Sequence, residues 1–252
     1  KRLQVSLSWR LRYQDLFRLS GELSTNDKAS VGLAENDPYR LATLVQQVSY
    51  DARDNPLNPT RGWYFSLQVE ESSKFFGSNF AYVRASPEAR GYLSLGTRTV
   101  LATRLRLAST YLVGQVLPIT QRYFAGGSSS QRGFAQQTLS PVLGGGNGVP
   151  VGGESLAETN FEIRRFVYDW GSDDDDSNDI AVVAFVDGAD VTNKPAELFE
   201  SQLHWATGMG LRWHTIVGTF RGDLGYRLNR TGPNEIVPGS TWEWFINLGE
   251  AF

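Results

Sequence analysis

The sequence predicts an all-β fold, a transmembrane antiparallel β-barrel, and three observations carry the prediction. Apolar and polar residues alternate with period two from one end of the 252 residues to the other. The polar faces mix arginines and acids with glycine and alanine, whereas the apolar faces are broad and aromatic near strand ends. No stretch has the period of an amphipathic helix, and no apolar run approaches the ~20 residues of a membrane helix.

The composition agrees with this class and excludes others. Lys and Arg number 24 against 27 Asp and Glu, without a basic block, so a nucleic-acid partner is not expected. The chain has no cysteine, which excludes disulfides, thiolate metal sites and cysteine nucleophiles. Its 26 glycines and 12% aromatic residues fit sheets with tight turns. The mean hydropathy of -0.31 resembles that of a soluble protein, but a membrane barrel keeps its charges in the lumen.

About eleven segments fit the strand pattern. They span residues 2–13, 16–25, 40–51, 62–72, 79–95, 98–113, 154–168, 179–188, 202–213, 216–228 and 240–252.

The bounds of the first segments follow from the turn-forming residues between them. A short turn at Gln14–Asp15 separates the first two, and the segment at 51–61 is rich in turn-forming residues. The fifth contains Pro87, which has no N–H to donate to a ladder and demands an edge, bulge or kink. In the sixth, Leu101 and Leu105 share a face opposite two arginines.

The later segments alternate most clearly. In 202–213, Trp205, Met209 and Trp213 share one face, opposite glycines and Arg212. The last segment places Trp242, Trp244, Ile246, Leu248 and the terminal Phe252 on one face, which is expected to meet lipid.

Two further features bear on the architecture. Short connections alternate with long ones, as in membrane barrels with short periplasmic turns and long outer loops. Bacterial single-chain barrels have an even number of strands, so an odd count means either that the count is off by one or that strands are missing before Lys1, and the second reading is preferred. The alternative from periodicity alone is a large soluble barrel or a double sandwich.

Several separated motifs give a resemblance to a known family. They are Arg122–Phe134 (RYFAGGSSSQRGF), Pro150–Glu154 with Asn160–Arg164, Phe185–Ala189 and Gly208–Trp213, with the turn at Asp51–Trp63. In this order they resemble the BamA/TamA superfamily of outer-membrane assembly and translocation factors. The resemblance covers about residue 39 to the end, and the ending at 245–252 looks more like TamA. It implies a barrel of sixteen strands, of which this chain would hold the last eleven, preceded by periplasmic POTRA repeats.

The resemblance also implies a site. The loop at 114–153 would fold back into the lumen, where Arg132, followed by Gly133 and Phe134, would be held by Glu162 and Asp187 on the inner wall. Alternation independently places both acids on the lumenal face. A guanidinium presents a fork of donors that suits two carboxylates. Gln131 departs from the family, which has an aliphatic residue there.

A wider set of charged residues is expected to line the lumen as a network that fixes register and controls solvent passage. These residues are Arg104, Arg106, Arg212, Arg221, Asp223 and Arg227. No catalytic constellation, metal-ligand spacing or cofactor motif is found, so an enzyme is not expected.

The resemblance implies an outer-membrane protein assembly factor in a bacterial outer membrane. Thr241, Trp242, Trp244, Gly249 and Phe252 would form one side of a lateral seam at which unfolded clients insert. The expected partners are the lipid bilayer, unfolded outer-membrane or secreted clients, and the POTRA repeats. The alternatives are a polypeptide-translocating secretion pore of the two-partner type, a general diffusion porin, and a barrel anchor for a fused N-terminal domain.

Overall fold

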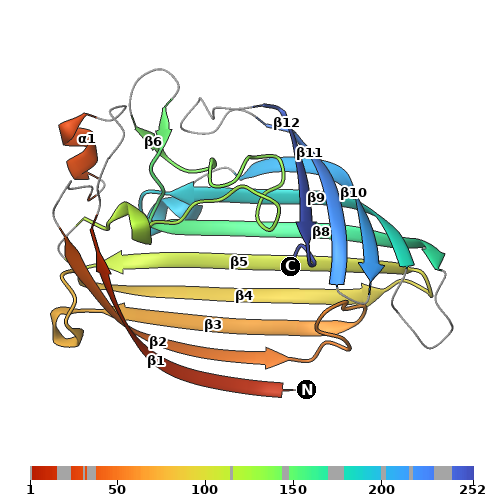
Figure 1. The fold of residues 1–252 in the computed structure, drawn as a ribbon, viewed down its shortest axis with the longest axis horizontal. Coiled ribbons are helices and arrows are strands. Elements are labelled where there is room, and N and C mark those ends of the chain that lie inside the picture. Colours follow the sequence, from red (N-terminus) through yellow and green to blue (C-terminus); the bar gives the residue numbers. More distant parts are fainter. Residues whose placement is uncertain are drawn as a thin grey trace.

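The computed structural model is built on one curved antiparallel sheet, and it confirms the all-β prediction. It describes residues 2–15, 24–30, 32, 38–113, 116–143, 148–169, 179–199, 203–215, 218–229 and 240–252. Ten strands lie in the order β1-β2-β3-β4-β5-β8-β9-β10-β11-β12, and neighbours in the sheet follow one another along the chain. Figure 1 shows β1 to β5 side by side and the sheet curling through β8 to β12.

The strands of the sheet are β1 (Arg2–Gln14), β2 (Tyr39–Asp51), β3 (Gly62–Ser72), β4 (Tyr82–Ser94), β5 (Thr99–Leu112), β8 (Ser155–Asp169), β9 (Asp179–Thr192), β10 (His204–Thr215), β11 (Gly218–Arg227) and β12 (Trp242–Leu248). A separate two-stranded ribbon is formed by β6 (Val142–Leu143) and β7 (Val149–Pro150). The helical elements are α1 (Thr25–Ser30), η1 (Lys74–Phe76), η2 (Ile119–Gln121) and η3 (Pro195–Phe199). No helix in the described part of the chain has the length and apolarity to cross a membrane.

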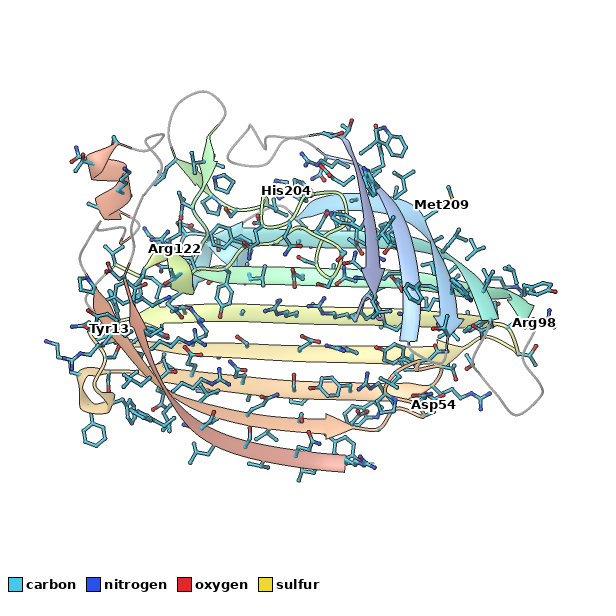
Figure 2. The ribbon with its side chains drawn as sticks, in the orientation of Figure 1. Tyr13, Asp54, Arg98, Arg122, His204 and Met209 are labelled. Atoms are coloured by element: carbon cyan, nitrogen blue, oxygen red, sulfur yellow. The ribbon has the colours of Figure 1, made fainter. Side chains whose placement is uncertain are left out.

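The two faces of the sheet differ as the period-two pattern predicts. Large apolar side chains stand exposed on the outer face, including Tyr13 at 69% and Met209 at 67% exposure (Figure 2). The inner face of the later strands carries buried charges instead, such as Glu162 and Arg212. An apolar outside with a polar inside is the arrangement that a membrane barrel requires.

One predicted strand, at 16–25, does not take its expected place. Residues 16–23 lie outside the described part, and Thr25 begins helix α1. All thirteen residues of β1 pair with β2, so no strand lies between them. In the described part of the chain the sheet holds ten strands, one fewer than the eleven predicted.

Pro87 was predicted to need an edge, a bulge or a kink, but β4 has a neighbour on each side and keeps its register with both, so Pro87 makes neither an edge nor a bulge and only local pairs with β5 are lost. It lies within β4, where the pairing to β5 passes from Ala85–Ser109 to Glu88–Arg106 and omits Ser86 and Pro87. The ring nitrogen of proline cannot donate to a ladder, and the break follows from that.

The end of the chain departs from the prediction. The last strand stops at Leu248, and Gly249 has a φ of 102°, which turns the backbone inward. Phe252 is only 8% exposed and packs with Tyr92 and Ala102 of the opposite inner wall. The prediction that Phe252 faces lipid is therefore wrong. The physical reason is Glu250, a charge that finds partners on the inner wall and none in lipid.

The core lies where the 114–153 loop meets the inner wall. Ala125, Phe134 and Leu139 of the loop pack with Leu156 of β8 and with Ala189 and Val191 of β9, all of them at most 4% exposed. This apolar contact holds the loop against the wall beside the charged residues described next.

Candidate functional site

The loop between β5 and β8 is shaped by its own short pairings. Two isolated bridges, Tyr123 to Gly153 and Ala125 to Leu139, draw the loop into a narrow fold. The backbone N–H groups at these bridges donate over 2.8–3.0 Å. Residues 129–134, called the tip below, project from this fold toward β8, β9, β10 and β11.

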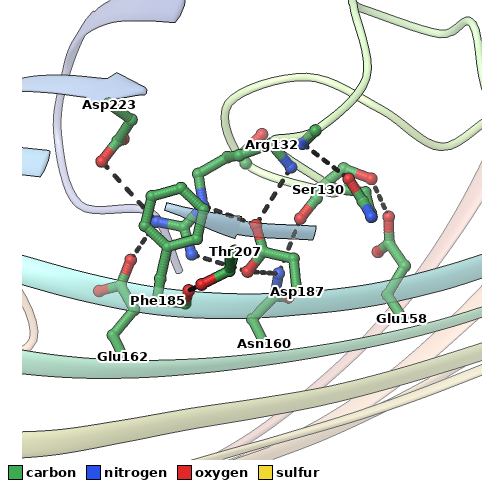
Figure 3. A network of polar contacts seen from close by, with 12 residues as sticks. Ser130, Arg132, Glu158, Asn160, Glu162, Phe185, Asp187, Thr207 and Asp223 are labelled. Atoms are coloured by element: carbon green, nitrogen blue, oxygen red, sulfur yellow. Dashed lines mark hydrogen bonds and ion pairs between the residues drawn. The ribbon is translucent and has the colours of Figure 1, made fainter. Parts of the chain in front are cut away.

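Arg132 is the centre of the tip and is 1% exposed. Its Nε donates to Asp187 Oδ2 and its Nη2 to Asp187 Oδ1, both over 2.7 Å, a bidentate pair (Figure 3). Its Nη1 donates to Glu162, and Asp223 lies 3.8 Å from the same nitrogen. The guanidinium carbon also stands 3.5 Å from the centre of the Phe185 ring. The structure thus brings together Arg132, Glu162 and Asp187, the three residues that the resemblance grouped.

The charge of Arg132 is compensated by these acids. Burial alone would lower the pKa of the guanidinium, but the nearby carboxylates of Asp187 and Glu162 raise it above its ordinary value. The side chain stays charged at every ordinary pH, so the contact is an ion pair between buried groups and not a neutral hydrogen bond. Removing one partner of such a pair leaves the other charge without compensation.

A second group of contacts holds the tip from the side of β5 and β8. Ser130 Oγ donates to Glu158, and Asn160 Nδ2 donates to the Ser130 carbonyl over 2.7 Å and to Asp187 Oδ1 over 2.8 Å. Arg104 reaches the Ser129 carbonyl over 2.7 Å and also pairs with Glu158 at 3.2 Å. The tip is therefore attached at two adjacent points of the wall.

The residues on either side of Arg132 are also fixed. Gln131 is fully buried, donates to the His204 carbonyl over 2.9 Å and accepts the Gly133 N–H over 2.7 Å. Both ends of this amide have partners, so a polar residue fits where the family has an aliphatic one. Phe134 is fully buried with the Arg227 guanidinium 4.0 Å from its ring centre, and Arg227 Nε donates to the Gly133 carbonyl.

Close backbone approach explains one glycine on the wall. A Cβ on Gly225 of β11 would lie 2.1 Å from the carbonyl oxygen of Arg132. Any side chain at that position would push the tip off the sheet, because the obstacle is backbone and cannot rotate away. Gly225 is therefore part of the surface on which the tip rests.

The other predicted lumenal charges fall into two groups, one around Glu162 and Asp223 and one around Glu158. Arg212 Nη1 donates to Asp223 over 2.7 Å, its Nη2 lies 3.3 Å from Glu162, and Arg221 stands opposite Arg212 in the β10–β11 register, 3.8 Å from Asp223. Arg106 belongs to the second group, since its Nη1 lies 3.3 Å from Glu158. All are on the inner face, and the first group adjoins Arg132.

The last strand, β12, is called the seam strand below. It has seven residues, whereas the other strands of the sheet have 10 to 15. It pairs with β11, and within the described residues it has no second neighbour. Trp242 and Trp244 stand 54% and 71% exposed on its outer face, and the Thr241 carbonyl accepts the Arg227 N–H just before it.

The tail that follows the seam strand, residues 249–252, turns to the inner wall. Glu250 pairs with Arg164 at 3.0 Å and with His214 Nε2 at 3.2 Å, and Tyr92 Oη donates to the Phe252 carbonyl over 3.0 Å. Gly249 and Phe252, predicted as strand residues, belong to this tail instead.

Sequence reasoning did not assign a role to several residues of this site. Glu158 and Asn160 alternate with Glu162 along β8, and the shared face was the signal available for them. Arg164 lies on the same face, two residues further on. Glu250 falls on the apolar face of the last predicted strand, and a charge there was the sign that the strand ends earlier.

No group of three or more His, Cys, Asp or Glu side chains in the described part of the chain is placed to hold a metal ion.

Comparisons with known proteins give a consistent result. The family model described as the Omp85 superfamily domain matches residues 1–252. Outer membrane protein assembly factor BamA of Nitratidesulfovibrio vulgaris is 25% identical over 231 residues, which are 90% of this chain and 28% of that protein. The SAM50-like protein CG7639 of Drosophila melanogaster is 29% identical over 157 residues, 60% of this chain and 33% of that protein.

A solved structure has the same fold. The crystal structure of BamA from Haemophilus ducreyi lacking POTRA domains 1–3 superposes with a TM-score of 0.70 at 20% identity, over 96% of this chain and 50% of that one. The chain thus spans between about a quarter and a half of the length of these relatives.

Proposed function

This chain belongs to the Omp85 superfamily, and from that premise we propose that it forms part of the wall of an outer-membrane protein assembly factor that folds or inserts client β-barrel proteins. The relatives named for this activity are BamA proteins, of which the chain covers only a part. Its outer apolar face would contact the lipid of a bacterial outer membrane, and POTRA repeats would precede it in the whole protein.

The seam strand is the observation that supports this proposal most. A strand with one neighbour exposes a row of backbone N–H and C=O groups on which another strand can be added. Seven pairs hold the seam strand to β11, so it is the shortest ladder in the sheet. An incoming client strand would pair along this edge, and the folding of the client would supply the free energy of insertion.

The experiment captures a client at the seam. The full-length protein carries a single cysteine at Ile246, is reconstituted in lipid vesicles and receives a urea-unfolded β-barrel client with cysteines along its last strand. Met209→Cys is the matched control, because Met209 and Ile246 are 67% and 75% exposed on the outer face but β10 is paired on both sides. Disulfide capture at Ile246 and not at Met209 is expected. Equal capture at both positions, with client folding intact, would contradict the proposal.

A secretion pore of the two-partner type is the second candidate. The observation in its favour is that the tip is held in the lumen by ion pairs, which could be exchanged for solvent if the loop withdrew. This reading predicts that Arg132→Gln sharply raises single-channel conductance, and that a secreted polypeptide crosslinks to Arg221→Cys. The assembly reading predicts capture at the seam strand without cargo at position 221.

A further inference from the structure

The tail and the tip share one line of ion pairs on the inner wall. Arg132 pairs with Glu162, Glu162 Oε2 accepts from Arg164 Nε over 2.9 Å, and Arg164 Nη1 lies 3.0 Å from Glu250. His214 extends the line, since its Nε2 lies 3.2 Å from Glu250. A loop residue and a tail residue more than a hundred positions apart are thus separated by two side chains.

Glu162 is the link in this line. Its Oε1 receives Arg132 and Arg212, and its Oε2 receives Arg164. The carboxylate is fully buried and held from both sides, so one orientation satisfies all three arginines. Loss of any one of them changes the orientation that the other two favour.

Arg164 depends on that orientation. Its side chain is 3% exposed, and Glu162 and Glu250 are the two acids with which it forms ion pairs in the described part of the chain. Since Glu162 receives its Nε, the direction of the guanidinium, and with it the reach of Nη1 toward Glu250, follows Glu162. The spacing of two residues on one strand keeps Glu162 and Arg164 on the same face.

The apolar contacts of the tail centre on Phe252. Phe252 packs with Tyr92 and Ala102, and the Arg164 guanidinium stands 5.7 Å from its ring. The residue before this group is Gly249, at the positive φ noted above, with no atom within 4 Å of the place where its Cβ would be. The polar contacts that hold the tail on the inner wall thus include the Glu250 ion pairs and the Tyr92 hydrogen bond to the Phe252 carbonyl, and the Glu250 pairs are the ones that connect it to the line.

We propose that the docking of the tip and the docking of the tail are coupled through Glu162 and Arg164, so that release of either loosens the other. The inference deepens the proposed function and rests on it for its meaning, because the tail continues the seam strand. A tip in place would keep the seam strand anchored to the far wall, and a tip that withdraws would free it.

Two buried alanines serve as reporters. Ala251→Cys, the tail reporter, and Ala125→Cys, the loop reporter, replace residues that are 4% and 0% exposed. These 252 residues have no other cysteine, and any cysteine elsewhere in the full-length protein is replaced by serine, so the reaction rate with a water-soluble maleimide measures exposure at that position alone. The measurements use the full-length protein in lipid vesicles without any client.

For each variant, the labelling rate is measured at the reporter on the other segment, so that a change in the tip is detected in the tail and a change in the tail is detected in the loop. Arg132→Gln leaves every direct partner of the tail intact and is expected to speed labelling of the tail reporter about fivefold or more, the low end of coupling between sites. Glu250→Gln is expected to speed the loop reporter by a similar factor, because coupling of binding equilibria is reciprocal. Arg122→Gln is the matched control: among the described residues its guanidinium donates to the Leu117, Gly152 and Ser30 carbonyls and forms no ion pair with the line.

The control should leave the tail reporter at its original rate. The coupling is overturned if neither variant changes the distant reporter more than twofold. If Arg132→Gln fails to insert into the membrane, Glu250→Gln with the loop reporter tests the coupling instead, and if Glu250→Gln fails to insert, Arg132→Gln with the tail reporter does. Because no client is present, a negative result leaves the seam-capture experiment unaffected, and failure of seam capture leaves the reporter rates unaffected.

Discussion

Replacing Arg132 by Gln should release the tip from the wall by a predictable amount. The substitution removes the bidentate pair with Asp187 and the contact with Glu162. Glu162 keeps Arg164 and Arg212, so Asp187 is the acid left without a cation, with Asn160 as its remaining side-chain donor. Breaking a buried pair costs roughly 3–5 kcal/mol, and the lower end applies because one of the two acids stays compensated.

A loss of about 3 kcal/mol corresponds to roughly a 150-fold rise in the population with the tip released. The rate at which maleimide labels the loop reporter measures that population, provided that the tip leaves and rejoins the wall faster than the cysteine reacts. Asp187→Asn alone should produce a rise of similar size, since Arg132 then loses its bidentate partner. The double variant should lose at least about 2 kcal/mol less than the sum of the two, the expected sign for groups in direct contact.

Additivity of the two substitutions would refute the reasoning, as would a rate in Arg132→Gln within twofold of the original. Additivity would mean that Arg132 and Asp187 do not stabilise the tip through their contact with each other. An unchanged labelling rate would mean that the apolar contacts and Glu158 are enough to hold the tip. Arg122→Gln, in the same loop but outside these ion pairs, supplies the baseline for a loop arginine whose hydrogen bonds in the described part of the chain go to backbone carbonyls.

Three further predictions use the same reporters. Gly225→Ala should speed the loop reporter at least tenfold, because its Cβ would meet the Arg132 carbonyl at 2.1 Å, whereas Gly222→Ala on the same strand, with its nearest atom at 4.0 Å, should not; equal rates would contradict the contact. Tyr92→Phe removes the hydrogen bond to the Phe252 carbonyl, worth about 1 kcal/mol, and should speed the tail reporter about fivefold, and a rate below the original would oppose this. Burial alone would raise the pKa of Glu250, but Arg164 and His214 lower it to about 2, so tail anchoring should persist above pH 4.5 and fade as the pH falls toward 2. A nitroxide on the tail reporter would follow this by electron paramagnetic resonance, and a transition centred near pH 6 would exclude Glu250 as the group responsible.

The sheet could be predicted from the sequence because each strand carries its own period. Alternation of buried and exposed positions is a local property, and the strands at 202–213 and 216–228 are found within a few residues of their predicted bounds. The segment at 16–25 alternates too, but β1 already occupies the edge of β2. The pairing of strands depends on the whole sheet, so the sequence of a single segment does not show which neighbour it takes.

The candidate site was predictable only in part. Alternation places Glu162 and Asp187 on the inner face, but it does not say which loop arginine meets them, and that came from the resemblance. The tail was missed because a single glycine ends the period. Gly249 can turn the backbone to a positive φ, and every residue after it leaves the face that counting by two assigns.

The sequence separations of these contacts set an order for the folding of the chain itself. Arg132 lies 30 and 55 residues from its two acids, and Tyr92 lies 160 residues from Phe252. Closing a longer loop costs more entropy, and no contact can form before both of its partners have been synthesised. The two acids that bind Arg132 are present once β9 has been made, but the tip also rests on Gly225 and Arg227, so it settles only after β11. The tail needs both β4 and the residues after β12. Among the contacts described above, the Tyr92–Phe252 hydrogen bond joins the residues furthest apart in the sequence, and it is expected to form after the ion pairs of the tip.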